Sequence, residues 1–241
     1  MRRILFIAIV SLVSILGTIT VLGGFSTMSS AQTPTPGVTV DRTPKSSVAN
    51  GLIEKAKISW PWYLTRISGL VAAASFIILM LSGIGLLTGH TFSFFEPITA
   101  WASHRALGIT FSVSVLVHVG SLYFDHFVPF GLTSLLVPFA SNYKQIDLLG
   151  FPVGSLYIAL GVLSLYLSIA IVLTSLFMIE KKPRLWKVTH ILSYLAMIFV
   201  FIHALFLGTD LSSGVLRWLW ILLAFIVMYA SLARLWRAKT V

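Results

Sequence analysis

The sequence predicts an all-α integral membrane protein, a bundle of six transmembrane helices, or of five if the first apolar segment is a cleaved signal peptide. Of the 241 residues, 57% are hydrophobic and only 10% are charged, and the mean hydropathy is +0.96. An ordinary soluble domain carries about 25% charged residues. Several apolar segments reach the length of about 20 residues that crosses a bilayer core of about 30 Å. Because backbone groups inside lipid must hydrogen-bond within their own segment, we expect helices.

The apolar segments divide the chain into three parts. We predict a signal peptide or first transmembrane helix over residues 1–31, an exposed linker over residues 32–60, and a membrane domain over residues 61–241. The predicted membrane segments are Ile4–Gly23, Leu64–Thr88, His104–Phe124, Val153–Ile179, Val188–Leu207 and Val215–Leu235.

The first segment has two interpretations that stay open. Arg2 and Arg3 precede an apolar run, and the small residues of Ser29-Ser30-Ala31 resemble a cleavage site, as in a signal peptide. The apolar run of about 20 residues is longer than the usual 7–15, which favours an uncleaved helix. The following stretch Gln32–Asn50 is rich in Pro, Ser and Thr and is therefore expected to be a linker.

The positions of Lys and Arg predict the orientation, because these residues are enriched in cytoplasmic connections. The formal charge of +10 includes two dense clusters, and the loop Gly208–Gly214 carries neither residue. We therefore expect both clusters and the C-terminus on the cytoplasmic side of the plasma (inner) membrane. This orientation would place Lys55, Lys57 and Arg66 outside, against the rule. We base the predicted orientation on the two clusters because they are denser. The clusters consist of Lys181, Lys182, Arg184, Lys187, Arg234, Arg237 and Lys239.

Four of the six histidines lie inside predicted helices, where an ionisable side chain is costly and needs a partner. His104 and His118 are 14 residues apart, and His190 and His203 are 13 apart, which is about 21 Å and about 19.5 Å along a helix. If both helices start from the cytoplasm, His104 and His190 share one depth (the first pair), and His118 and His203 share the other (the second pair). Since haem iron takes one axial ligand on each face, each pair predicts one b-type haem.

The helical rotation fits one histidine helix better than the other. At about 100° per residue, 14 steps bring His118 to within about 40° of His104, whereas 13 steps leave His203 about 140° from His190. The second helix is therefore expected to bend, to change its winding or to meet the haems from different sides. The alternative for each histidine is a buried polar side chain bonded to its neighbours. His90 and His126 lie at helix ends, and we expect both to be interfacial.

These histidine spacings resemble the ferric reductase-like transmembrane family, which includes the membrane domains of NADPH oxidases and carries two bis-histidine haems b between two helices. The matching strings are HRALGITFSVSVLVH, which starts at His104, and HILSYLAMIFVFIH, which starts at His190. The wider string WKVTHILSYLAMIFVFIHALF is similar to a helix of the haem subunit that serves bacterial methionine sulfoxide reductase. The resemblance runs from about Trp62 to Arg237.

The resemblance implies that residues 61–241 bind two b haems, with His104, His118, His190 and His203 as the iron ligands. It also implies electron transfer from a cytoplasmic donor to an external acceptor, such as ferric iron, oxygen or an exported redox partner. Full-length ferric reductases add a flavin and NAD(P)H module, but no GxGxxG follows a strand here. We therefore expect a separate flavin reductase or a quinol as the donor of this oxidoreductase subunit. The chain contains no cysteine, so c-type haem attachment and iron–sulfur clusters are excluded.

Two alternative functions stay open. One is a quinol-linked dihaem cytochrome b subunit, which also has two histidine-bearing helices. The other is a non-redox membrane transporter or assembly protein that contains paired polar histidines. A b-type haem spectrum separates the second alternative from the redox functions, and the identity of the reducing donor separates the first.

Two further residues are candidates for haem contact. Phe111 lies seven residues from both His104 and His118, and therefore on their helix face. Its ring could shorten the electron-transfer distance between the haems or simply pack between them. Arg105 could bind a haem propionate or anchor the cytoplasmic end of its helix, and Arg66 has the same two interpretations on the outer side.

Small, acidic and aromatic residues complete the predicted surroundings. Tyr194 could bond a propionate or a quinone, or merely pack. Asp125 and Asp210 could shape an acceptor or cation site, but we expect them to be solvated loop acids. Four glycines leave room for porphyrin or for ordinary helix packing: Gly69, Gly83, Gly85 and Gly108. Tryptophans at segment ends predict an interfacial belt: Trp60, Trp62, Trp218, Trp220 and Trp236.

Overall fold

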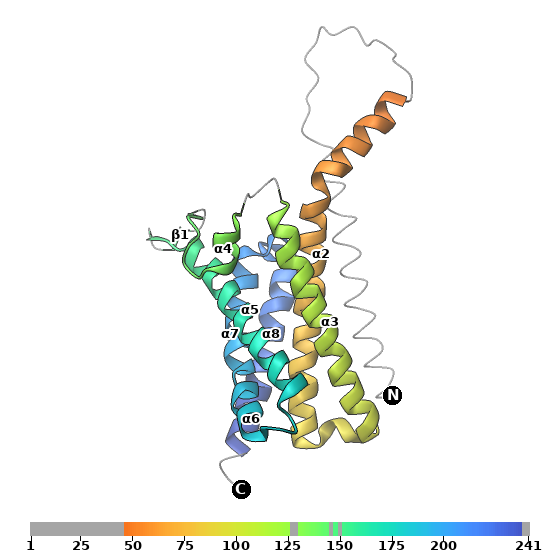
Figure 1. Cartoon of the computed structure of the whole chain (residues 1–241), viewed down its shortest axis with the longest axis vertical. Helices are drawn as coiled ribbons and strands as arrows, with labels where there is room; N and C mark the ends of the chain where they lie inside the picture. The colour runs from red at the N-terminus through yellow and green to blue at the C-terminus, as the bar shows by residue number, and fades with distance from the viewer. Residues whose placement is uncertain (1–45, 126–129, 145–146, 149–150, 238–241) are drawn as a thin grey trace.

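The computed structural model describes residues 46–125, 130–144, 147–148 and 151–237, which form an α-helical bundle (Figure 1). The predicted fold class, an all-α integral membrane protein, is confirmed. Five of the six predicted segments coincide with helices that are long and apolar enough to cross a membrane, whereas Ile4–Gly23 lies outside the described residues. The five candidate spans are Ser59–Thr88, Pro97–Tyr123, Gly154–Phe177, Pro183–Leu207 and Gly214–Trp236.

The long helices are joined by short turns, small helices and one hairpin. In chain order the main helices are α2 (Ser46–Thr88), α3 (Pro97–Tyr123), α5 (Gly154–Phe177), α6 (Pro183–Ile191), α7 (Ser193–Leu207) and α8 (Gly214–Arg237). The connecting elements are η1 (His90–Ser93), α4 (Leu132–Leu136), the strands β1 (Asp147–Leu148) and β2 (Phe151–Pro152), and η2 (Thr209–Leu211).

Helix α2 begins earlier than the hydropathy indicated. It starts at Ser46, so that the last part of the predicted linker, residues 46–60, is a helical extension of the first described span. The Pro/Ser/Thr-rich composition stops near Asn50, and the residues that follow include good helix formers such as Leu52 and Glu54. The boundary of the membrane domain at residue 61 stays a prediction.

The bundle consists of two helix pairs and a closing helix. Helix α2 packs along α3, α5 packs along α6 and α7, and α8 contacts both α2 and α7 (Figure 1). Trp220, which we expected in an interfacial belt, is only 6% exposed, and its Nε1–H donates to the carbonyl oxygen of Phe201 at 3.2 Å. That prediction is wrong because Trp220 lies on the face of α8 that joins the core, whereas Trp218 is exposed.

Large apolar side chains cover much of the outer surface. Ile98 is 84% exposed and Val215 is 78% exposed. A soluble protein rarely shows extended apolar patches, but a bilayer is the natural solvent for such a surface. The chain is therefore a multi-pass membrane protein, whereas the identity of the membrane and the side on which the C-terminus lies stay predictions.

Candidate functional site

The structure brings the four helical histidines together as the two pairs that the sequence predicts. In the first pair, the ring centroids of His104 on α3 and His190 on α6 lie 6.4 Å apart, with their planes inclined by 49°. In the second pair, His118 on α3 and His203 on α7 are close enough to interact electrostatically. All four side chains are partly buried. Each pair therefore joins α3 to the helix pair on the other side of the bundle.

A break in the second histidine helix reduces the rotational mismatch. Helix α6 ends at Ile191 and α7 begins at Ser193. The Leu192 amide between them donates to the carbonyl oxygen of Thr189 at 3.0 Å, three residues back, which is the spacing of the tighter 3₁₀ winding. Such a turn advances about 120° per residue instead of about 100°. The extra rotation moves His203 toward the side of the helix that carries the first pair's histidine.

Both histidines of the second pair donate to backbone carbonyls. The Nδ1 atom of His118 lies 2.9 Å from the carbonyl oxygen of Thr65 on α2, and that of His203 lies 2.9 Å from the carbonyl oxygen of Tyr157 on α5. Since a carbonyl oxygen can only accept, Nδ1 carries the proton in both rings. The tautomer therefore leaves the lone pair on Nε2, the atom that is then available to bind a metal.

Serine hydroxyls contact the first pair. The Nδ1 atom of His104 lies 2.8 Å from Ser82 Oγ, and this hydroxyl donates its own hydrogen to the carbonyl oxygen of Leu79 at 2.9 Å. Ser82 must therefore accept from Nδ1, which again leaves the lone pair of His104 on Nε2. The Nδ1 atom of His190 lies 3.4 Å from Ser175 Oγ on α5, a longer contact that does not fix which atom donates.

Glycines let the second pair approach its carbonyl acceptors. A carbonyl at position i of an α-helix bonds the amide at i+4 and still has a free lone pair. Gly69 follows Thr65 by four residues, and Gly161 follows Tyr157 by four. A Cβ atom at Gly69 would lie 3.0 Å from the nearby imidazole, and one at Gly161 would lie 2.5 Å from its imidazole. The missing side chains thus open the second lone pair to the rings.

The glycines predicted from the sequence to make room for porphyrin have different surroundings. Gly83 faces the first pair, because a Cβ there would lie 3.2 Å from Cε1 of His104. Gly85 instead packs against Thr91, and a Cβ at Gly108 would meet nothing within 4 Å. The sequence analysis did not identify Gly161. Gly161 and Ser175 are 14 residues apart, which is also the spacing of His104 and His118, and this match was a signal that could have identified the glycine.

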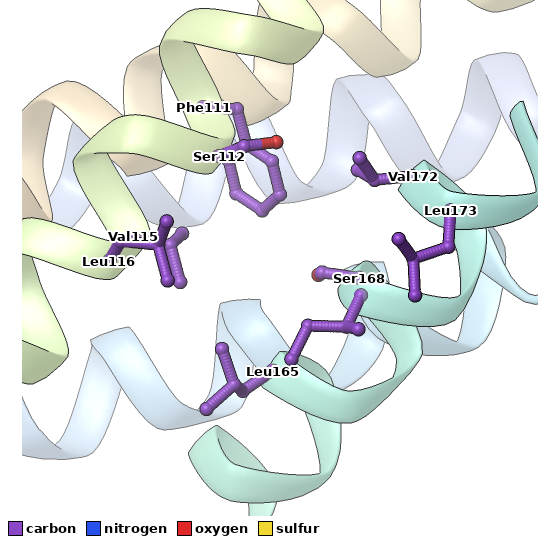
Figure 2. Close-up of a pocket in the computed structure, with 9 residues that line it drawn as sticks. Phe111, Ser112, Val115, Leu116, Leu165, Ser168, Val172 and Leu173 are labelled. Carbon is purple, nitrogen blue, oxygen red and sulfur yellow. The ribbon is translucent and has the colours of Figure 1, made fainter. Parts of the chain in front are cut away.

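An apolar hollow lies at the level between the two pairs. Phe111 is 5% exposed, and its ring stacks on Phe76 of α2 with centroids 5.1 Å apart. Beside it, a cavity of about 160 Å³ opens between α3 and α5 (Figure 2). Phe111 is therefore placed where the sequence predicts it, between the levels of the histidines on its helix. The hollow is lined by Phe111, Ser112, Val115, Leu116, Leu165, Ser168, Ile169, Val172 and Leu173.

The charged residues at the second-pair end are paired within the protein. Arg66 forms a two-contact ion pair with Asp210 of η2, with 2.9 Å between Nε and Oδ2, and its guanidinium lies 4.1 Å from the ring centroid of Trp62. Asp125 is only 6% exposed. The prediction that both acids are solvated is therefore wrong, because α2 runs close to the chain that follows α7.

The remaining candidates lie nearer the surface. Arg105 is exposed on α3, and its contact with a propionate stays a prediction. The Tyr194 hydroxyl accepts from Arg234 Nη1 at 3.0 Å, which gives it a partner within the protein. His90 is exposed and contacts the Thr88 hydroxyl at 3.0 Å. His126 lies outside the described residues.

The donor set suits a metal that brings its own equatorial ligands. Within the described ranges, no three or more His, Cys, Asp or Glu side chains group closely enough to hold a bare ion. A structural metal ion normally takes about four protein ligands, whereas haem iron takes two because the porphyrin supplies the others. Two pairs of imidazoles, in which His104, His118 and His203 have free Nε2 atoms, therefore fit haem better than an isolated cation.

Comparison with known proteins identifies the family. The family model for the ferric reductase like transmembrane component matches residues 68–201, more than half of the 241 residues. No curated protein and no solved structure matches the chain significantly. The match spans His104, His118 and His190 and ends two residues before His203. The resemblance seen in the histidine spacing is thus confirmed, and the chain belongs to the ferric reductase-like transmembrane component family.

Proposed function

We propose that this protein carries electrons across a membrane through two b haems, one held by each histidine pair. Membership of the ferric reductase-like family supports transmembrane electron transfer in general. The observation that carries the two-haem proposal is the common arrangement of the four rings. Each Nδ1 has a partner on α2 or α5, and in His104, His118 and His203 this contact leaves Nε2 for iron.

The residues around the rings fit the proposed cofactor. The ligands would be His104 and His190 for one haem and His118 and His203 for the other. Haem supplies a one-electron iron couple, and its potential depends on the hydrogen bonding and the polarity around the iron ligands. The carbonyl and hydroxyl acceptors hold the imidazoles of His104, His118 and His203 in a fixed orientation and raise their basicity. Buried apolar side chains, which include Phe76 and Phe111, pack between the levels of the two pairs and lower the polarity there.

We propose that Phe111 assists transfer between the two pairs. Its ring is held by Phe76, and it borders the hollow between α3 and α5 (Figure 2). Replacing Phe111 with Leu should slow transfer between the haems while both haems stay bound. Flash photolysis of the half-reduced protein measures this rate, and an unchanged rate would leave Phe111 with a packing role only.

The proposed direction runs from the first pair to the second. The Lys and Arg residues of 181–187, at the start of α6 and just before it, lie beside the first pair, and cytoplasmic connections are enriched in Lys and Arg. Electrons would therefore enter from a cytoplasmic flavin reductase or from a quinol. They would leave beside the second pair to ferric iron, oxygen or an exported redox partner. Arg105, next to the first pair, is the proposed partner of a haem propionate.

Haem content of single-histidine variants tests the proposal. Purified protein should show a b-type spectrum and about two haems per chain. His104→Ala and His190→Ala should each lose the same haem, and His118→Ala and His203→Ala should each lose the other. A double variant that replaces both histidines of one pair should therefore still bind one haem. A colourless protein made with ample haem would contradict the proposal and favour a non-redox membrane protein. Loss of the same haem on replacing His104 or His118 would contradict the pairing.

A further inference from the structure

We infer that the end of the connection between α5 and α6, together with the start of α6, is a docking surface for an anionic, water-soluble electron donor, and that Trp186 conducts electrons from this surface to the first pair. We call residues 180–187 the basic connection. The inference rests on the proposed function and selects between the two donors left open above. A neutral quinol dissolved in the bilayer would need no cationic surface, whereas a donor with a phosphate or carboxylate edge would be attracted to one.

The basic connection carries an excess of uncommitted positive charge. Its four cations accompany one acid, Glu180, and all five side chains are exposed. Across the described part of the chain, none of these four cations is paired with a carboxylate. By contrast, Arg66 is bound to Asp210, and Arg234 donates to a tyrosine hydroxyl. The four available cations are Lys181, Lys182, Arg184 and Lys187.

Trp186 links this charged surface to a histidine of the first pair. It lies among the four cations in sequence, but its side chain is partly buried. Its ring centroid is 5.5 Å from that of His190, and its Nε1–H donates to Ser175 Oγ at 3.3 Å. The same oxygen contacts His190 Nδ1 at 3.4 Å, and the ring of His104 lies 6.4 Å beyond. An aromatic path thus runs from the basic connection into the first pair.

The chemistry balances with a reduced flavin as donor. A fully reduced flavin gives up two electrons in two successive one-electron transfers, which reduce two ferric haem irons. Its two protons are released to the aqueous phase on the same side. A positively charged surface raises the rate of encounter with an anionic partner by about 10–10³-fold, and added salt removes this advantage.

Two flavins that share one ring system provide the test. Reduced flavin mononucleotide carries a phosphate, whereas reduced riboflavin is neutral at the same position. Oxidised protein in a neutral detergent is mixed with each donor, and haem reduction is followed by stopped-flow absorbance. At low salt the nucleotide should react on the order of tenfold faster than riboflavin, and this ratio should approach one as the salt concentration rises.

Variants then locate the surface. Replacing all four cations with Gln should abolish the preference for the nucleotide and leave the riboflavin rate unchanged. The double variant Lys182→Gln/Arg184→Gln should reduce the ratio of the two rates at least twofold. It replaces the fourfold variant in the test if that variant folds poorly. Lys144→Gln is the matched control, because Lys144 is exposed between α4 and β1, at the opposite end of the bundle from α6 (Figure 1). It should leave the preference intact.

Substitutions of Trp186 test the conducting path separately. Trp186→Leu should slow reduction by both flavins several-fold, and Trp186→Phe should slow it less, while the haem content and spectrum stay unchanged. An unaltered preference in the cation variants would overturn the docking surface and leave these residues as anchors to lipid headgroups. Equal rates in Trp186→Leu and the unmodified protein would overturn the path. Loss of haem from the unmodified protein would instead contradict the proposed function.

Discussion

The two histidine pairs share the helix α3 but depend on different kinds of acceptor. His118 and His203 donate to backbone carbonyls on α2 and α5. His104 and His190 contact serine hydroxyls on the same two helices. A backbone acceptor cannot be removed by substituting its side chain, whereas a hydroxyl can. The first pair is therefore tuned directly by side chains, and the second pair only through the glycines that give access to the carbonyls.

The comparison also shows that α2 and α5 play equivalent parts. In each helix a carbonyl is opened to an imidazole by a glycine four residues later, at Gly69 and Gly161. In each helix a serine, Ser82 or Ser175, meets the other histidine pair. The helices α2 and α5 thus position the histidines with the same kinds of contact, although their sequences share no obvious repeat.

The largest expected effect is at Gly161. A Cβ atom there would lie 2.5 Å from Nδ1 and Cε1 of His203, which is closer than atoms can approach, so the ring must leave its position. We expect Gly161→Ala to lose the second-pair haem and to retain the other, so that haem content falls from about two per chain to about one. The pyridine haemochrome assay measures this ratio.

The control for this experiment is Gly120→Ala, at an exposed position of α3 that is turned away from His118. A Cβ at Gly120 meets nothing within 4 Å, and alanine is more favourable than glycine inside a helix by about 1 kcal/mol. The control should therefore keep both haems and be at least as stable. Retention of two haems by Gly161→Ala would contradict the role assigned to the glycine.

Gly69→Ala should have a smaller effect on the same pair. The added Cβ would lie 3.0 Å from Nδ1 and 3.1 Å from Cε1 of His118, so a shift of a few tenths of an ångström would relieve the contact. We expect the haem to stay bound, with a weakened bond from Nδ1 to the carbonyl and a less basic imidazole. The midpoint potential of the second-pair haem should rise, as measured by redox titration. A lowered potential would show that the bond had become stronger.

The sequence was sufficient to predict the spans and the pairing because both depend on simple periodicities. Low charge and long apolar runs predict membrane helices, and matched spacings place the histidines of α3 and of α6 and α7 at common levels. The histidine spacing predicted that the second histidine helix would bend or change its winding, but not where. No proline or glycine marks the break at Leu192. Its position depends on how α6 and α7 pack against α5, which a single sequence does not reveal.

The surroundings of the pairs were harder to predict for a physical reason. Acceptors such as the carbonyls of Thr65 and Tyr157 have no side-chain signature, so they become visible only when the helices are placed side by side. Ion pairs between distant segments, such as Arg66 with Asp210, depend on the same packing. From the sequence alone, a charged loop residue is expected to be solvated. The partner of Arg66 lies 144 residues away and cannot be recognised from the local sequence.

Ser82→Ala should weaken the first pair by removing a defined hydrogen bond. Nδ1–H of His104 would lose its acceptor, and a partly buried donor without a partner costs about 1–3 kcal/mol. Loss of such a supporting bond typically lowers metal affinity by about 10–100-fold. Haem transfer to apomyoglobin measures the affinity of the first-pair haem. Ser231→Ala is the control, because Ser231 is more deeply buried than Ser82 but bonds only to its own helix.

The smallest expected effect is that of Ser175→Ala on the same haem. The contact from Ser175 Oγ to His190 Nδ1 is 3.4 Å, longer than the 2.7–3.2 Å of an ordinary bond, so little binding energy is lost with it. We expect a loss of affinity of only a few-fold. Since Ser82 and Ser175 contact histidines that would hold the same haem, the effects of the two changes should be coupled, not simply additive, in the double variant. A loss in Ser175→Ala that equals or exceeds that in Ser82→Ala would mean that His190 is held as firmly as His104, and the distinction between the two ligands of the first pair would fail.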